Sequence, residues 1–312
     1  MTPHPVFVVG CPRSGTGLLR DLLRSHPSLA FPTESHFIPA FHRGYGDPRD
    51  EAEALALARR ILGLRWVRAW RLPLEPRDLA HHRSYAALVD DLFTAYARRA
   101  GRPRWGDKTP QYVRAMPQLR ELFPHARFVH IVRDGRDVCR SVVAAAFGPR
   151  NLVTAAAWWR GHVAAGRADG ARLGPKAYLE VRYEDLLAEP EEVMRGVVAF
   201  VEEPWDDAVL RPSRRDPIRP ERAASWRIAM PREDRRIVEA VAGDLLAELG
   251  YDVPDPPGTI GAHERAVARI DHAARILALR LRRRDRSFWT TELELRRAAW
   301  RARLRGGCGG MV

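Results

Sequence analysis

Near the start of the chain, a continuous run of apolar residues is followed, after a Gly-rich stretch, by apolar residues at helical spacing. Val6 to Gly10 is a short apolar run, typical of a strand buried on both faces of a parallel sheet. After the Gly-rich stretch, leucines recur at helical spacing until Pro27 ends the pattern. They are Leu18, Leu19, Leu22 and Leu23. The pattern predicts a strand, a loop and a helix.

The same order of elements occurs twice more along the chain. Phe128 to Val132 is a second apolar run, followed by a polar turn and a helical pattern through Val138 and Val142. Ala177 to Val181 is a third run, and a helical stretch follows Tyr183. Strands that alternate with helices predict an α/β fold with a central parallel sheet flanked by helices. Ligands of such sheets bind at the carboxyl ends of the strands.

Other segments read as helical or irregular. Residues 50–100 are mostly helical by composition, and we expect an insertion over about 45–100 that covers one edge of the sheet. Residues 211–222 are rich in Pro and Arg and predict a loop. A helical pattern over 236–249 then ends at Gly250, a suitable C-terminal cap.

Composition fits a globular protein, with 46% hydrophobic and 29% charged residues among 312. No apolar stretch approaches the ~20 residues of a membrane helix, and the first residues lack the pattern of a signal peptide, so we expect a cytoplasmic protein. The three cysteines have neither paired nor metal-ligand spacing. We therefore predict no disulfide and no metal site.

Positive charge is concentrated at the end of the chain. Residues 261–312 hold 13 Arg and five acidic residues, and so contribute +8 to the net charge of +13. Within them, apolar residues recur in helical steps of three and four from Val267 to Leu281. We divide the chain into a main domain, 1–255, and a basic amphipathic helical tail, 256–312.

The tail has several interpretations. Its helix can pack on the main domain with an arginine face in water, attach to an anionic membrane surface, or support self-association. We expect no nucleic-acid partner, because no recognition motif accompanies the charge. The chain has only two lysines, Lys108 and Lys176, and the second has no chemical context.

A candidate anion site lies in the loop between the first predicted strand and the helix that follows it. In Gly10-Cys11-Pro12-Arg13-Ser14-Gly15-Thr16-Gly17, successive backbone N–H groups and the helix N-terminus converge. The glycine spacing matches a Walker A loop, but Thr16 and Gly17 replace the Lys-Ser/Thr pair of that motif. Arg13 can supply the missing charge, and Ser14 a hydroxyl donor. The alternative is a tight turn that binds nothing.

Three motifs in order resemble the sulfotransferases that use 3′-phosphoadenosine 5′-phosphosulfate (PAPS), most closely the tyrosylprotein-sulfotransferase-like branch and its bacterial relatives. They are PRSGTG at 12–17, WGDKTP at 105–110 and FVHIVRDGRDVCRS at 128–141. The resemblance implies a P-loop-like three-layer fold, PAPS as cofactor, the bisphosphate PAP as product, and no metal. It also implies these cofactor-binding residues: Arg13, Ser14, Gly15, Thr16 and Gly17 for the phosphosulfate, Arg133 and Ser141 for the 3′-phosphate, and Tyr183. Surface pairing of Arg133 with Asp134 or Asp137 is the alternative.

The resemblance also implies catalytic roles. Glu34 stands at the position of the family's general base, Lys108 at that of the lysine near the bridging oxygen, and Arg13 beside the transferred group. Ser225, or its neighbour Ala224, would lie near the leaving oxygen. His36 is the rival candidate for the base. The alternative for Glu34 is a structural role at a helix N-terminus, where Thr33 or Ser35 caps the helix and the Glu34 carboxylate favours the helix dipole. A solvated turn lysine is the alternative for Lys108.

The predicted function is in-line transfer of a sulfuryl group from PAPS to a hydroxyl acceptor, with Glu34 as general base. The alternatives are a nucleotide-dependent kinase on a P-loop scaffold and a non-catalytic nucleotide-binding interaction protein. The acceptor cannot be read from the chain. Peptide tyrosine, glycan, lipid and natural-product hydroxyls all remain open.

Overall fold

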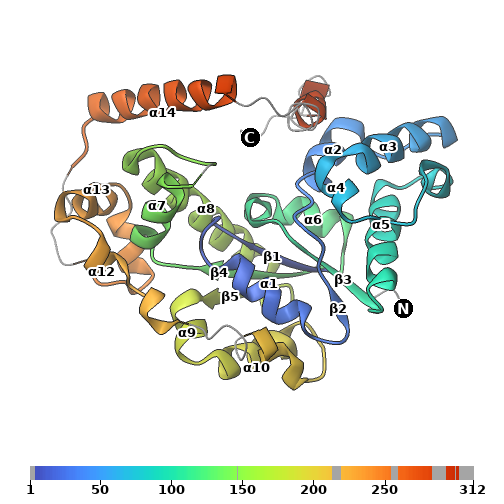
Figure 1. The fold of residues 1–312 in the computed structure, drawn as a ribbon, viewed down its shortest axis with the longest axis horizontal. Coiled ribbons are helices and arrows are strands. Elements are labelled where there is room, and N and C mark those ends of the chain that lie inside the picture. The colour runs from blue at the N-terminus through green and yellow to red at the C-terminus, as the bar shows by residue number, and fades with distance from the viewer. Residues whose placement is uncertain are drawn as a thin grey trace.

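The computed structural model describes residues 4–145, 147–212, 219–253, 259–282, 293–298 and 300–301. Within them, five strands form one parallel sheet in the order β2-β3-β1-β4-β5 (Figure 1). The strands are β1 (Val6–Gly10), β2 (Leu29–Ala30), β3 (Arg104–Lys108), β4 (Arg127–Val132) and β5 (Tyr178–Arg182). Val8 pairs with Lys108 and Gly10 with Ile131, so the carboxyl ends of the three central strands meet at one edge.

The central strand is buried from both sides because its side chains alternate between two cores. Val6 and Val8 belong to one hydrophobic cluster, and Phe7 and Val9 to another. All five residues of β1 are buried. The apolar run of the sequence therefore marks a central parallel strand, as predicted.

Helices cover both faces and complete a three-layer α/β fold of the P-loop-like type, which confirms the predicted class (Figure 1). The helices of the first half are α1 (Thr16–Arg24), α2 (Ile38–Tyr45), α3 (Glu51–Gly63), α4 (Arg65–Ala69), η1 (Pro76–Leu79), α5 (Tyr85–Arg99), η2 (Pro110–Arg114) and α6 (Met116–Leu122). Those that follow are α7 (Gly135–Val143), α8 (Leu152–Leu173), α9 (Tyr183–Ala188), α10 (Pro190–Phe200), η3 (Asp207–Leu210), η4 (Pro220–Arg222), α12 (Trp226–Ala229), α13 (Arg232–Glu248) and α14 (Ala262–Arg282).

Three hydrophobic clusters divide the helices, and one of them joins α7, α8, α12 and α13. α1, α9 and α10 pack on the face that carries Val6 and Val8. The helices of the predicted insertion, α3 to α5, share a core with Phe7 and Trp105, and α2, which precedes the insertion, packs into the same core. Cap residues fix several helix starts; for example, the Asp50 side chain accepts a hydrogen bond from the Glu53 backbone N–H of α3. Gly250 has φ 75° just beyond α13, as the C-terminal cap requires.

Two strands were not predicted, β2 and β3. β2 has only two residues, too few to show a pattern. β3 reads Arg-Trp-Gly-Asp-Lys, a polar sequence, yet all five residues are buried. Arg104 pairs with Glu203 at 2.9 Å, and the Trp105 indole N–H donates to Asp90 at 2.8 Å. Burial is tolerated because these polar groups have partners within the fold.

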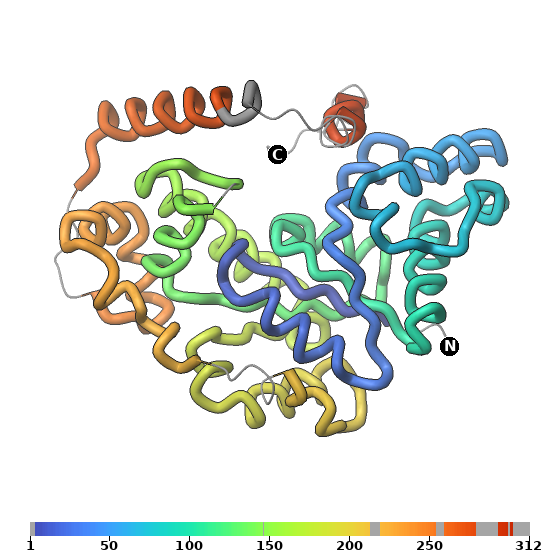
Figure 2. The backbone as a smooth tube through the Cα atoms, in the orientation of Figure 1, coloured from blue at the N-terminus to red at the C-terminus, as the bar shows by residue number. Residues whose placement is uncertain are grey.

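The tail helix α14 lies at the edge of the molecule (Figure 2) and contacts α8. Asn151 at the start of α8 donates to the Ala268 carbonyl at 2.7 Å and to the Asp271 carboxylate at 2.9 Å. Helical residues 293–298 dock beside α2 and α3, where Glu294 pairs with Arg60 at 2.9 Å and Ala298 is fully buried. The division at residue 255 stays a prediction. No described helix combines the length and hydropathy needed to cross a membrane.

Candidate active site

The Gly-rich loop between β1 and α1 folds as a tight turn that leads directly into the helix, which is the local geometry its sequence predicts. Arg13 has φ 77° and Gly15 has φ 96°, two left-handed residues that turn the backbone before the helix starts at Thr16. The Ser14 N–H donates to the Cys11 carbonyl at 3.1 Å and closes the turn. A Cβ on Gly15 would lie 2.3 Å from the ring of Tyr183, so glycine is required there. No atom lies within 4 Å of an added Cβ at Gly17.

The loop and the second predicted anion site are joined by direct contacts. Arg13 Nε donates to Ser141 Oγ at 2.9 Å, and Arg133 Nη1 donates to the Arg13 carbonyl at 3.4 Å. The Arg133 guanidinium also lies over the Tyr183 ring, 4.5 Å from its centroid. Arg13, Arg133 and Tyr183 follow the carboxyl ends of β1, β4 and β5, and Ser141 lies on α7. The fold therefore brings the predicted cofactor-binding residues together.

Two buried polar atoms in this cluster have no hydrogen-bond partner among the described residues. They are Ser14 Oγ and Arg133 Nε. Ser14 is fully buried, and an unsatisfied hydroxyl there is costly. A phosphate or sulfuryl oxygen supplies the acceptor that each lacks, so the residues present fit a ligand with two anionic groups. Arg133 also pairs with Asp137 at 3.5 Å, so the alternative pairing exists beside these contacts.

Glu34, His36 and Lys108 meet at the end of β3. Lys108 Nζ donates to Glu34 Oε1, and Glu34 Oε2 lies 3.0 Å from His36 Nε2. The Lys108 side chain is 9% exposed and that of Glu34 30%. Lys108 is thus a buried strand residue, and the solvated-turn alternative is wrong.

The charge of Glu34 is fixed by this arrangement. Burial raises its pKa, but the hydrogen bond from His36 and the Lys108 ammonium outweigh burial and lower the pKa to about 2. The capping alternative is wrong, because α2 begins at Ile38 and has no side-chain cap. Thr33 Oγ1 instead accepts from the Trp70 indole at 2.9 Å.

A buried polar network that the sequence analysis missed holds the Glu34 segment against β3. Ser35 Oγ donates to Asp107 and lies 2.8 Å from the Tyr112 hydroxyl. Thr109 Oγ1 accepts from the Ser35 N–H at 3.1 Å and donates to Asp107 at 2.9 Å. Burial raises the pKa of Asp107 to about 6. The polar residues within PTESHF and WGDKTP were the available signal, and they position their charged neighbours.

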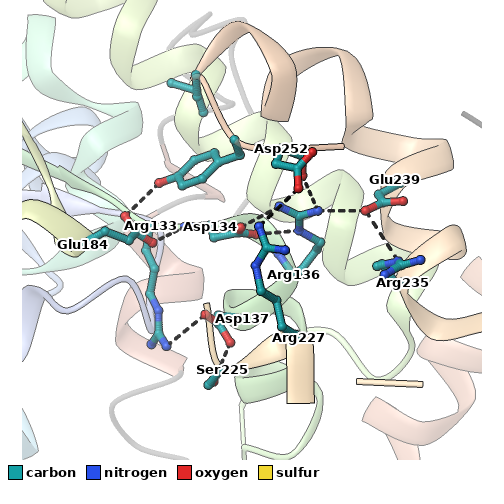
Figure 3. Close-up of polar contacts among 12 residues, drawn as sticks. Arg133, Asp134, Arg136, Asp137, Glu184, Ser225, Arg227, Arg235, Glu239 and Asp252 are labelled. Carbon is teal, nitrogen blue, oxygen red and sulfur yellow. Dashed lines mark hydrogen bonds and ion pairs between the residues drawn. The ribbon is translucent and has the colours of Figure 1, made fainter. Parts of the chain in front are cut away.

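Ser225 lies against α7. Its hydroxyl donates to Asp137 at 2.6 Å (Figure 3). The same hydroxyl accepts from Arg140 Nη2 at 2.8 Å. Asp137 is also the carboxylate that pairs with Arg133. These contacts connect Ser225 to the second anion site, and no described contact joins it to Glu34 or Lys108.

Arg136 was not predicted to matter, yet it is the centre of the network in Figure 3. It is 1% exposed and donates twice to Asp134, at 3.0 and 2.8 Å, and once to Glu239 at 2.8 Å. Its guanidinium lies 3.6 Å from the Trp226 ring centroid. The network ties α7, which follows Arg133, to α12 and α13 and so fixes the second anion site.

The remaining chemistry-bearing residues lie elsewhere. Cys11 and Cys139 are free and buried, and Cys308 lies outside the described residues. Lys176 is exposed. Among the described residues, one group of side chains in the helical insertion could hold a metal ion. It consists of His81, His82 and Asp91.

The chain is an α/β protein with a Gly-rich strand–loop–helix junction at the carboxyl end of β1 and a carboxylate–ammonium pair, Glu34 and Lys108, at the end of the neighbouring strand β3. A family model described as "Sulfotransferase family" matches residues 5–207. The chain belongs to the sulfotransferase family and is a sulfotransferase, the class that takes its sulfuryl group from PAPS. Family membership decides against the kinase and the non-catalytic alternatives.

Two curated relatives match most of the chain. Protein-tyrosine sulfotransferase A of Caenorhabditis elegans is 25% identical over 296 residues, which cover 85% of this chain and 71% of the relative. Protein-tyrosine sulfotransferase 1 of Danio rerio is 26% identical over 301 residues, 87% of this chain and 78% of the relative. Among solved structures, the sulfotransferase domain from the curacin biosynthetic pathway is similar in fold. Its TM-score is 0.55 at 21% identity, and the match covers 81% of this chain and 99% of that domain.

Proposed function

We propose that this sulfotransferase transfers the sulfuryl group of PAPS in line to a hydroxyl acceptor, with Glu34 as general base. The observation that carries the proposal is the Glu34 carboxylate, held ionised beside the Lys108 ammonium at the strand end next to the Gly-rich loop. An ionised carboxylate can accept the acceptor's proton, and an ammonium can stabilise developing negative charge.

The anion-binding residues divide between two ends of the cofactor. Arg13, Ser14, Gly15, Thr16 and Gly17 would hold its phosphosulfate through side-chain donors, backbone N–H groups and the start of α1. Arg133 and Ser141 would hold its 3′-phosphate, and the Tyr183 ring, which packs against the Arg133 guanidinium, would keep Arg133 in position. We assign Ser225 to the same end, because it bonds to Asp137 and Arg140.

PAPS supplies a sulfuryl group whose departure leaves negative charge on a phosphate oxygen. Glu34 takes the proton from the acceptor hydroxyl as the new S–O bond forms and the bond to the phosphate oxygen breaks. Lys108 and Arg13 balance the charge that gathers on that oxygen. The proposed chemistry needs no metal, since cationic side chains and backbone N–H groups provide this balance. Chelation with EDTA is expected to leave turnover unchanged.

The acceptor follows from chemistry and from the relatives. The named relatives are protein-tyrosine sulfotransferases, so a phenolic hydroxyl is the first acceptor class to test. Alcohol hydroxyls of glycans, lipids and natural products form the second panel. A cytoplasmic location and the lack of a nucleic-acid partner stay predictions.

The cofactor assignment is tested by thermal shift. The protein is titrated with PAP, ADP, and ATP with and without magnesium, because binding to the native state raises the melting temperature. We expect a metal-independent shift with PAP that is much smaller with ADP and is lost in Arg133→Ala. A shift only with ATP and magnesium would overturn the assignment. Transfer from radiolabelled PAPS to phenolic and alcoholic acceptors, in the native protein and in Glu34→Gln, tests the base.

A further inference from the structure

The outward face of α14 carries an apolar stripe. Val267, Ile270 and Leu277 are 50%, 70% and 59% exposed and follow one another at helical spacing. Leu293 and Trp300, further along the tail, are 50% and 61% exposed. The described residues have seven exposed large hydrophobic side chains in all, so the tail holds five of them. Such a concentration marks an interaction surface rather than scattered exposure.

The opposite face of α14 is the one held by the protein. Asn151 binds the Ala268 carbonyl and Asp271, and Ile276 is half-buried on the same side. A cavity of about 950 Å³ separates α14 from α8 and α13, and Arg265 and Arg269 line it. The helix is therefore seated with its polar side inward. This orientation is the reverse of a helix that packs its apolar stripe on its own domain.

The positive charge around the apolar stripe indicates that its partner is anionic. At 3.6 residues per turn, Arg269 lies to one side of the stripe, where it also lines the cavity, and Arg275 lies to the other side, where it pairs with Asp271 at 2.7 Å. Both side chains are exposed. The segment 261–312 carries 13 Arg against five acidic residues. Arginines that flank an apolar stripe can reach phosphate groups while the stripe enters an apolar layer. Two such tails would repel each other, which disfavours a second copy of the chain as the partner.

We infer that α14 docks this sulfotransferase on a membrane surface rich in anionic phospholipid. The helix lies parallel to the surface, with Val267, Ile270 and Leu277 entering the boundary between headgroups and acyl chains. Arg269 and Arg275 contact lipid phosphates at either side. Attachment is peripheral.

The test is flotation of the full chain with vesicles of two compositions, neutral phosphatidylcholine alone and phosphatidylcholine with 30% phosphatidylglycerol (about one anionic lipid in three). We expect binding to the anionic vesicles only, and weaker binding as salt screens the arginines. The double variant Ile270→Gln/Leu277→Gln should lose at least about tenfold in partitioning. Ile228→Gln, which removes a 96% exposed isoleucine from α12, is the matched control and should bind like the native protein. An unchanged thermal shift with PAP shows that each variant is folded.

Three outcomes would overturn the inference. The first is no binding to anionic vesicles, or equal binding to neutral ones. The second is a double variant that binds as well as the native protein. The third is a concentration-dependent dimer, seen by light scattering without vesicles and abolished by the double variant, which would make a second copy of the chain the partner of the stripe.

Discussion

The Glu34–Lys108 pair leads to an unexpected prediction about Glu34→Gln. In the proposed reaction Lys108 balances charge on the leaving oxygen, yet without ligand its ammonium is bound to Glu34. Cofactor binding must therefore weaken this ion pair. Replacing Glu34 by glutamine removes the charge that competes for Lys108. We expect Glu34→Gln to lose turnover and to bind PAP more tightly than the native protein.

The size of both effects follows from the burial of the two side chains. Lys108 is 9% exposed and Glu34 30%, so the pair lies between a surface salt bridge and a buried one. Surface pairs are worth about 0–1 kcal/mol, and breaking a buried pair costs about 3–5 kcal/mol. We take about 1–2 kcal/mol for this pair, which corresponds to roughly 5- to 30-fold tighter PAP binding. Loss of a general base is expected to lower turnover by about 10²–10⁴-fold.

The assay is calorimetric titration with PAP, which needs no knowledge of the acceptor. Lys108→Met is the companion variant and should weaken PAP binding by about 10-fold or more, because it removes a charge-assisted hydrogen bond. His36→Gln is the control for the rival base and should keep turnover within tenfold. The reasoning is refuted if Glu34→Gln binds PAP more weakly than the native protein, or if it retains native turnover.

Three further predictions concern positioning and stability. Gly15→Ala should abolish measurable PAP binding in the thermal-shift assay, because the added Cβ would lie 2.3 Å from the Tyr183 ring. Gly63→Ala is the control: no atom lies within 4 Å of its added Cβ, so PAP binding should be unchanged. Arg136→Met should lower the free energy of unfolding in urea by about 3–5 kcal/mol, because Asp134 and Glu239 stay buried without their cation; a loss below about 1 kcal/mol would contradict the role of this network. The pKa of Asp107 is raised to about 6 in the folded state, so this group favours folding at low pH and that contribution is lost as pH rises from about 4 to 6. Asp107→Asn should flatten this part of the stability–pH curve, and an unchanged curve would argue against the raised pKa.

The strands and helices that have a regular pattern of hydrophobic residues could be predicted from the sequence. β1 and β4 are apolar runs buried on both faces, and their spacing to the following helices is regular. β3 could not be predicted, because its sequence is polar and its burial depends on partners far along the chain. Arg104 needs Glu203, and Asp107 needs Ser35. Tertiary contacts overrode the local pattern.

The candidate site shows the same division between local and distant information. The loop from Gly10 to Gly17 is contiguous, so its geometry follows from glycine positions and from the strand before it. The contact between Glu34 and Lys108 cannot be predicted from local sequence, because the two residues are 74 positions apart. They meet only when β3 inserts beside β1. That insertion depends on the buried hydrogen bonds of Ser35, Thr109 and Asp107. A network of this kind must be fully satisfied to be stable, which ties the Glu34 carboxylate, the proposed general base, to the folding of the central sheet. Changes in the network should therefore alter turnover before they alter cofactor binding at the loop.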